Sequence, residues 1–150
     1  MWKERLQQIV QEMESYDEEI NVGATREEIQ LFLKRSKTEL NVAVPDEYLK
    51  ILEVVNGIEF NGFILYGIDE ELLDGKQNQS IYGMIEYNKI LHENERKKKY
   101  LFLGESDISW FVYDLEECQY RELDNPSGRE SEAFDCVEDL VEKILSDALE

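Results

Sequence analysis

Apolar residues at helical spacing organise the first third of the chain. The first set falls on one face and predicts an amphipathic helix over residues 2–16. Thr25 and Glu28 then form the Thr-x-x-Glu pattern of a capping box, which predicts that a second helix begins there. Its buried face extends to about Leu40. The apolar positions of the first helix are Trp2, Leu6, Ile9, Val10 and Met13.

The segment from Val44 to Gly67 combines a helix start, a helix end and a strand start. Pro45 at the first helical position pre-sets φ, and the two acids after it face the positive end of the helix dipole. Apolar residues then recur at i, i+3, i+4 and i+7 up to residue 55. Asn56-Gly57 tolerates the left-handed conformation in which many helices end. Residues 63–66 read as a strand.

The middle of the chain mixes acidic, helical and basic stretches. Residues 68–79 carry acids and turn residues without sustained periodicity, which predicts an exposed acidic loop. A helical pattern over residues 81–91 is followed by the basic run 96–99, where cations suit the negative end of a helix dipole. We therefore expect a solvated helix end at this run.

Three short apolar runs near residues 100–104, 109–115 and 118–123 predict antiparallel strands. The middle run is apolar on both faces, as in a covered central strand, and the last alternates and belongs nearer an edge. A turn at Asn125-Pro126-Ser127-Gly128 and an acidic linker precede a final amphipathic helix, which begins at an Asp135-x-x-Glu138 pattern.

These elements predict one α+β domain over residues 1–150, with a mainly antiparallel sheet of about four to six short strands and about five helices. Hydrophobic residues make up 42% of the chain, and no apolar run approaches the ~20 residues that span a bilayer. The charged N-terminal residues lack the apolar core of a signal peptide, so a cytoplasmic protein is expected. Cys118 and Cys136 are expected to be reduced thiols in the core.

The charge balance narrows the choice of partners. The chain has 35 acidic and 16 basic residues and a formal net charge of −19. Such a field repels nucleic acid and anionic membranes and speeds encounter with a basic partner, although acidity also serves solubility alone. The basic run 96–99 lacks the aromatic interleaving of a nucleic-acid site, so neither nucleic acid nor membrane is expected as a partner.

A search for catalytic chemistry favours a binding module over an enzyme. His92 is the only histidine and suits a helix end, and with Cys118 and Cys136 it lacks the paired spacing of zinc sites. The acids from Asp69 to Asp74 are out of register for a calcium loop. No glycine loop for phosphate is present, and among 35 acids no carboxylate pair stands out. No catalytic residue, metal or cofactor is predicted.

The order of several short motifs resembles the SUKH superfamily, and most closely its Smi/Knr group, over about residues 25–147. In that family a proline-led helix ends in Asn-Gly and is followed by a strand. The matching stretches are Val44-Pro45-Asp46-Glu47-Tyr48-Leu49, Asn56-Gly57, Tyr66-Gly67, Phe102-Leu103-Gly104, Trp110-Phe111-Val112-Tyr113-Asp114 and the closing helix after Phe134.

The resemblance implies an α+β immunity protein that binds and neutralises a cognate toxin, often a nuclease with a basic groove. The alternatives are a regulatory scaffold that binds a host protein, as in the yeast branch, and a carboxylate-based enzyme. Homo-oligomerisation stays open. The predicted partner contacts are the loop acids Asp69, Glu70, Glu71, Asp74, Glu105 and Asp107. The predicted fold-determining residues are Pro45, Asn56, Gly57, Gly67 and Trp110.

Overall fold

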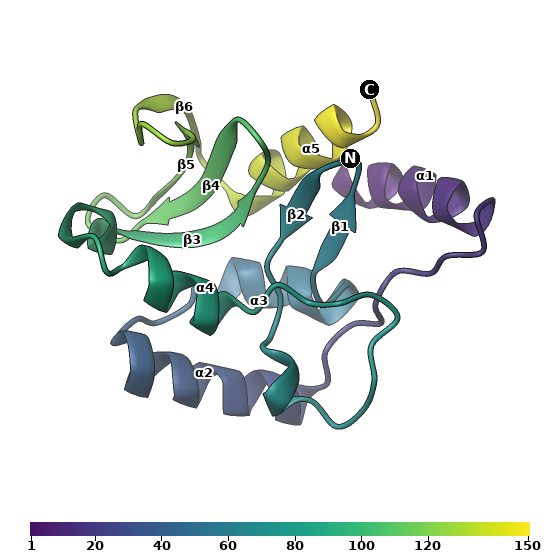
Figure 1. Cartoon of the computed structure of the whole chain (residues 1–150), viewed down its shortest axis with the longest axis horizontal. Coiled ribbons are helices and arrows are strands. Elements are labelled where there is room, and N and C mark those ends of the chain that lie inside the picture. Colours follow the sequence, from purple (N-terminus) through teal and green to yellow (C-terminus); the bar gives the residue numbers. More distant parts are fainter.

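A six-stranded antiparallel sheet and five α-helices make up the fold in the computed structural model, which describes residues 1–150 (Figure 1). The predicted α+β class is therefore confirmed. The helices are α1 (Trp2–Glu14), α2 (Arg26–Leu40), α3 (Asp46–Val54), α4 (Met84–Leu91) and α5 (Val137–Ala148), with short 3-10 helices η1 (Glu70–Leu72) and η2 (Glu95–Lys99). The strands are β1 (Ile58–Phe60), β2 (Phe63–Leu65), β3 (Tyr100–Glu105), β4 (Ser109–Asp114), β5 (Gln119–Asp124) and β6 (Glu130–Phe134).

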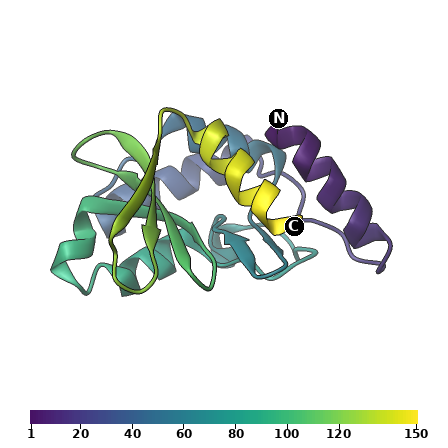
Figure 2. The same cartoon turned by 90° about the horizontal axis from the view of Figure 1, so that it is seen from above.

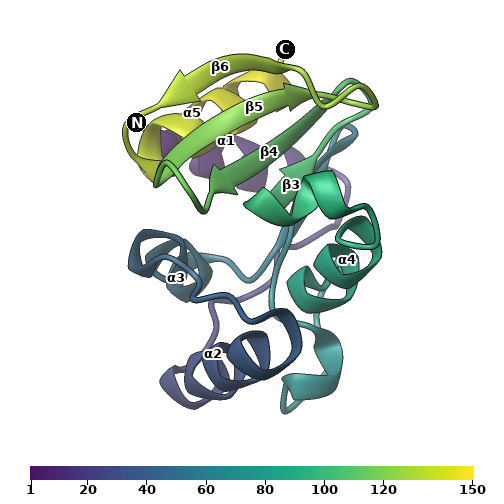
Figure 3. The same cartoon turned by 90° about the vertical axis from the view of Figure 1, so that its left-hand side faces the viewer.

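The strands lie in the sheet in chain order, and every neighbouring pair is antiparallel. Helix α5 packs against β2, β5 and β6, and α1 lies beside α5 (Figure 2). Helix α4 packs on β3 and α2 packs on α4, so that these helices gather below β3–β6 and away from α5 (Figure 3). The chain between β2 and β3 supplies η1, α4 and η2. None of the helices combines the length and the apolar character that crossing a membrane requires.

The joint between α3 and β2 is held by side-chain and backbone contacts that differ from the expected helix end. Helix α3 ends in extended backbone at Val55, not in a left-handed Asn56. Asn56 is 1% exposed, and its Oδ1 accepts from the backbone N–H of Ile68 at 2.8 Å. Gly57 has φ +78° and lies against Gly67, where an added Cβ would come within 2.7 Å of Asn56 Oδ1. Gly57 is therefore favoured by its positive φ, and Gly67 by the lack of space for a Cβ.

The first and last strands were not predicted from the sequence. β1 pairs with β2 through a turn at Asn61-Gly62, both at positive φ, and Asn-Gly is the strongest short hairpin pattern. β6 occupies the stretch predicted as an acidic linker. Its residues are exposed except for the last, so backbone pairing with β5 makes it a strand without any apolar pattern. β5 is consequently second from the edge and nearer to it than β4, as predicted.

Several local predictions have clear outcomes. The capping box is present, with Glu28 N–H bonded to Thr25 Oγ1 and Thr25 N–H to Glu28 Oε1. The proposed entry of α5 at Asp135 is wrong, because Cys136 is the N-cap residue and makes no side-chain cap. Cys118 is exposed in the β4–β5 turn and is not a core thiol; it and the half-buried Cys136 are both free.

Three further predicted positions have structural roles, one in the core and two at helix ends. Trp110 is 7% exposed, and Lys97 Nζ lies 4.4 Å from its ring centroid, so the basic run is partly packed and forms η2. Pro45 is the N-cap of α3, one position before the expected one. His92 ends α4 as expected, and its Nε2 lies 2.7 Å from the carbonyl oxygen of Tyr100.

Candidate partner-binding face

The structure places Asp69 in the interior, which corrects its prediction as an exposed contact. Its side chain is 5% exposed, and its two carboxylate oxygens accept from the N–H groups of Ile85 and Glu86, both at 3.0 Å. These are two of the four N–H groups that the first turn of a helix leaves without a partner in the helix. Burial raises the pKa of Asp69, although the two N–H donors favour its charged form. Asp69 therefore caps α4.

The other predicted contact acids fall into two groups. Glu70, Glu71 and Asp74 are exposed on and just after η1, and Glu70 Oε2 also accepts from the N–H of Ile81. Asp107 is exposed in the β3–β4 turn, whereas Glu105 is half-buried at the end of β3. The carboxylate of Glu105 accepts from the hydroxyl of Tyr66. Of the predicted contact acids, only Glu105 therefore adjoins a group of aromatic side chains.

Three tyrosines stack in series next to Glu105. The rings of Tyr66 and Tyr87 are stacked with their centroids 5.3 Å apart, and Tyr82 tilts against Tyr87 at 5.4 Å. They come from three elements: Tyr66 follows β2, Tyr82 precedes α4, and Tyr87 lies within it. Tyr66 is fully buried, while Tyr82 and Tyr87 are half-buried. The series therefore runs from the core to the surface.

Carboxylates surround the exposed end of this series. Glu59 of β1 and Glu86 in the first turn of α4 are exposed, and neither they nor Glu105 form a salt bridge. Burial raises the pKa of Tyr87, and the negative charges of Glu105, Glu86 and Glu59 raise it further. We call these six residues the tyrosine–carboxylate face: Tyr66, Tyr82, Tyr87, Glu59, Glu86 and Glu105.

The side chains of this face can contact cations through their carboxylates and hydrogen-bond acceptors through the tyrosine hydroxyls. Burial and the charges of Glu59 and Glu105 raise the pKa of Tyr82, so its hydroxyl stays protonated and can donate a hydrogen bond. Half-exposed tyrosines offer a rigid apolar ring with a polar tip, which is why they are enriched in protein interfaces. No group of three or more His, Cys, Asp or Glu side chains is placed to hold a metal ion.

Sequence reasoning missed five of the six residues of the face. Tyr87 falls in the apolar stripe of the helix predicted over residues 81–91 and therefore reads as core. Tyr82 lies within that predicted stretch but off its stripe, and the observed helix α4 begins only at Met84. Glu59 lies on a strand that was itself missed. The available clue was Asn61-Gly62, which predicts the hairpin and would have placed Glu59 and Phe60 on opposite sides of a strand.

Comparison with known proteins adds no relative. No protein-family model matches the chain, and no curated protein matches it. The resemblance to the SUKH superfamily stays a prediction from the motif order.

Proposed function

We propose that this chain is a cytoplasmic immunity protein of the SUKH type. It binds a cognate toxin, a nuclease with a basic active-site groove, and neutralises it by direct contact without catalysis. The observation that carries the proposal is the tyrosine–carboxylate face, in which the half-buried Tyr82 and Tyr87 lie among three carboxylates that form no salt bridge.

Charge supports this choice of partner. A nuclease groove presents lysine and arginine side chains to phosphates, and carboxylates can occupy the same positions. The net charge of −19 would also steer a basic partner toward the chain and raise the association rate. The exposed acids Glu70, Glu71, Asp74 and Asp107 contribute to this long-range field.

The tyrosines of the face favour a specific contact with the toxin, in addition to the long-range electrostatic attraction. Tyrosine is among the residue types that dominate binding energy when a partner covers them. Tyr87 stacks on Tyr66 and Tyr82 packs tilted against Tyr87, which holds the rings in place before binding and lowers the entropy cost of association.

The proposal predicts that the gene immediately upstream encodes a toxic domain, and the test is co-expression of the chain with that domain. The wild-type chain is expected to restore growth and to co-purify with the toxin. The variant Glu59→Lys/Glu86→Lys is expected to lose rescue, because two cations then face the basic groove.

A matched control separates the face from net charge. Glu14→Lys/Glu27→Lys makes the same change in charge at exposed glutamates outside the face, and Glu27, like Glu86, lies in the first turn of a helix. This variant should still rescue growth. Failure of the wild-type chain to rescue or co-purify would overturn the proposed function.

A further inference from the structure

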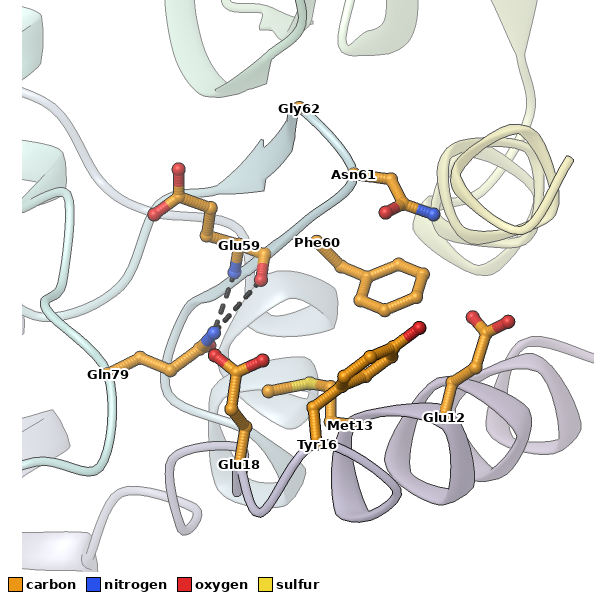
Figure 4. A pocket seen from close by; sticks show the side chains of 9 residues that line it. All are labelled: Glu12, Met13, Tyr16, Glu18, Glu59, Phe60, Asn61, Gly62 and Gln79. Atoms are coloured by element: carbon orange, nitrogen blue, oxygen red, sulfur yellow. Dashed lines mark hydrogen bonds between the residues drawn. The ribbon is translucent and has the colours of Figure 1, made fainter.

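A second surface, on the other side of the β1 strand, forms a pocket of about 530 Å³ between the end of α1 and the β1–β2 hairpin. We call it the hairpin pocket (Figure 4). Its walls are Glu12 and Met13 from the end of α1, Tyr16 and Glu18 from the segment just after it, and Phe60 from β1. Figure 4 shows the Glu59 carboxylate on the opposite side of the strand from the Phe60 ring, so Glu59 gives the pocket mainly backbone.

Two aromatic rings face the hairpin pocket. Figure 4 shows the rings of Tyr16 and Phe60 next to each other, with the Met13 side chain beside the base of Tyr16. Tyr16 is 76% exposed, so packing in the core does not account for its position, whereas Met13 is 3% exposed and closes the floor. Ring faces carry the negative part of the aromatic quadrupole and attract cations placed over them.

Carboxylates stand on both sides of these rings. Glu12 and Glu18 are exposed, and neither carboxylate takes part in a salt bridge or side-chain hydrogen bond. None of the residues that line the pocket is a lysine or an arginine. The pocket therefore combines aromatic faces with negative charge that nothing in the chain neutralises.

Hydrogen bonds fix the remaining walls. The amide of Gln79 pairs with β1 as another strand would, since its Nε2 donates to Glu59 O at 2.9 Å and its Oε1 accepts from Glu59 N at 3.3 Å. Asn61 Nδ2 donates to Ala148 O at 2.8 Å, which ties the hairpin to the end of α5. The hairpin side of the pocket is therefore held in place by hydrogen bonds to Gln79 and to the end of α5.

We propose that the hairpin pocket binds the guanidinium group of an arginine side chain from a partner polypeptide. A guanidinium is planar, stacks on aromatic faces and offers N–H donors to carboxylates on more than one side. An ammonium is a compact and strongly hydrated charge that uses such rings less well. An arginine within a peptide has no free α-amino or α-carboxyl group, so only its guanidinium brings charge to Glu12 and Glu18.

The inference goes beyond the proposed function, because it concerns a second surface and is tested without any toxin. The experiment titrates N-acetyl-arginine amide into the full chain and follows backbone amide NMR shifts. We expect saturable shifts at Tyr16, Phe60 and Gln79 with a Kd on the order of 1 mM, as suits a single side chain. N-acetyl-lysine amide should bind more weakly.

Variants of the pocket test the aromatic and the acidic contribution separately. Tyr16→Ala should weaken binding roughly two- to fivefold, the range of an exposed cation–π contact, and Tyr16→Phe should retain it. Glu12→Gln/Glu18→Gln should weaken binding further. Because Tyr16 is exposed, the Ala variant should keep its urea midpoint, which shows that the fold is intact.

The control for general attraction is Glu14→Gln/Glu27→Gln, which removes the same charge outside the pocket and should leave the Kd unchanged. Shifts that grow linearly without saturation would overturn the proposal. So would equal weakening by the control pair and the pocket pair, or unaltered binding by Tyr16→Ala.

Discussion

Replacing Asp69 by alanine tests whether this acid is a structural cap. The change removes both acceptors of the Ile85 and Glu86 N–H groups. Loss of an N-cap side chain costs about 0.5–2 kcal/mol. The N–H of Ile85, a residue 4% exposed, is also left buried without a partner, at a further cost of about 1–3 kcal/mol. We therefore expect a loss of about 3 kcal/mol in the free energy of unfolding.

Urea denaturation followed by circular dichroism measures this loss. With an m-value of about 2 kcal/mol/M, 3 kcal/mol lowers the midpoint by about 1.5 M. Glu71→Ala is the control from the same segment, since Glu71 is exposed and makes no hydrogen bond or salt bridge, and it should change stability by less than about 0.5 kcal/mol. An unchanged midpoint for Asp69→Ala would refute the capping role.

Three further predictions concern the joint, a buried acid and the tyrosine series. Gly67→Ala should cost about 1–3 kcal/mol in urea denaturation because its Cβ meets Asn56, while Gly75→Ala, with nothing within 4 Å, should not. Burial opposes the charge of Asp114, yet the N–H groups of Glu117 and Glu116 and the cations Arg121 and Lys99 hold its pKa below the ordinary value. The charge of Asp114 thus stabilises the fold above about pH 4, and this contribution is lost as the pH falls through the lowered pKa. Asp114→Asn should therefore cost about 2 kcal/mol in the free energy of unfolding at pH 7 and should flatten the acid limb of a stability–pH curve. An unaltered acid limb would contradict this. Tyr82→Ala should weaken toxin binding by about 2 kcal/mol in calorimetry, and an unchanged Kd would remove Tyr82 from the interface.

The elements with strong periodicity or caps could be predicted from the sequence. The stripe of α5 runs through buried positions, and the capping box of α2 forms as its residue types require. These depend on neighbours within one or two turns of helix. The strands β3 and β4 were predicted for a similar reason, since each contains an unbroken run of four apolar residues, nearly all of them buried.

What could not be predicted depends on contacts between distant segments. Asp69 caps a helix that starts 15 residues later, which no local spacing reveals. β6 is a strand because β5 pairs with it, not because of its own polar side chains. The tyrosine–carboxylate face combines residues of β1, the end of β2, α4 and β3. Composition therefore predicted an acidic partner-binding surface, but not where on the molecule it lies. The β1 hairpin was predictable from Asn61-Gly62 and was missed.

The most direct test of the central claim is the rate at which the toxic domain associates with the chain at several salt concentrations. For the wild-type chain we expect fast association that slows as salt rises. Glu59→Lys/Glu86→Lys should associate about tenfold more slowly at low salt and with a shallower salt dependence, while Glu14→Lys/Glu27→Lys should stay close to wild type. No association of the wild-type chain, or the same slowing in both variants, would contradict a specific tyrosine–carboxylate interface.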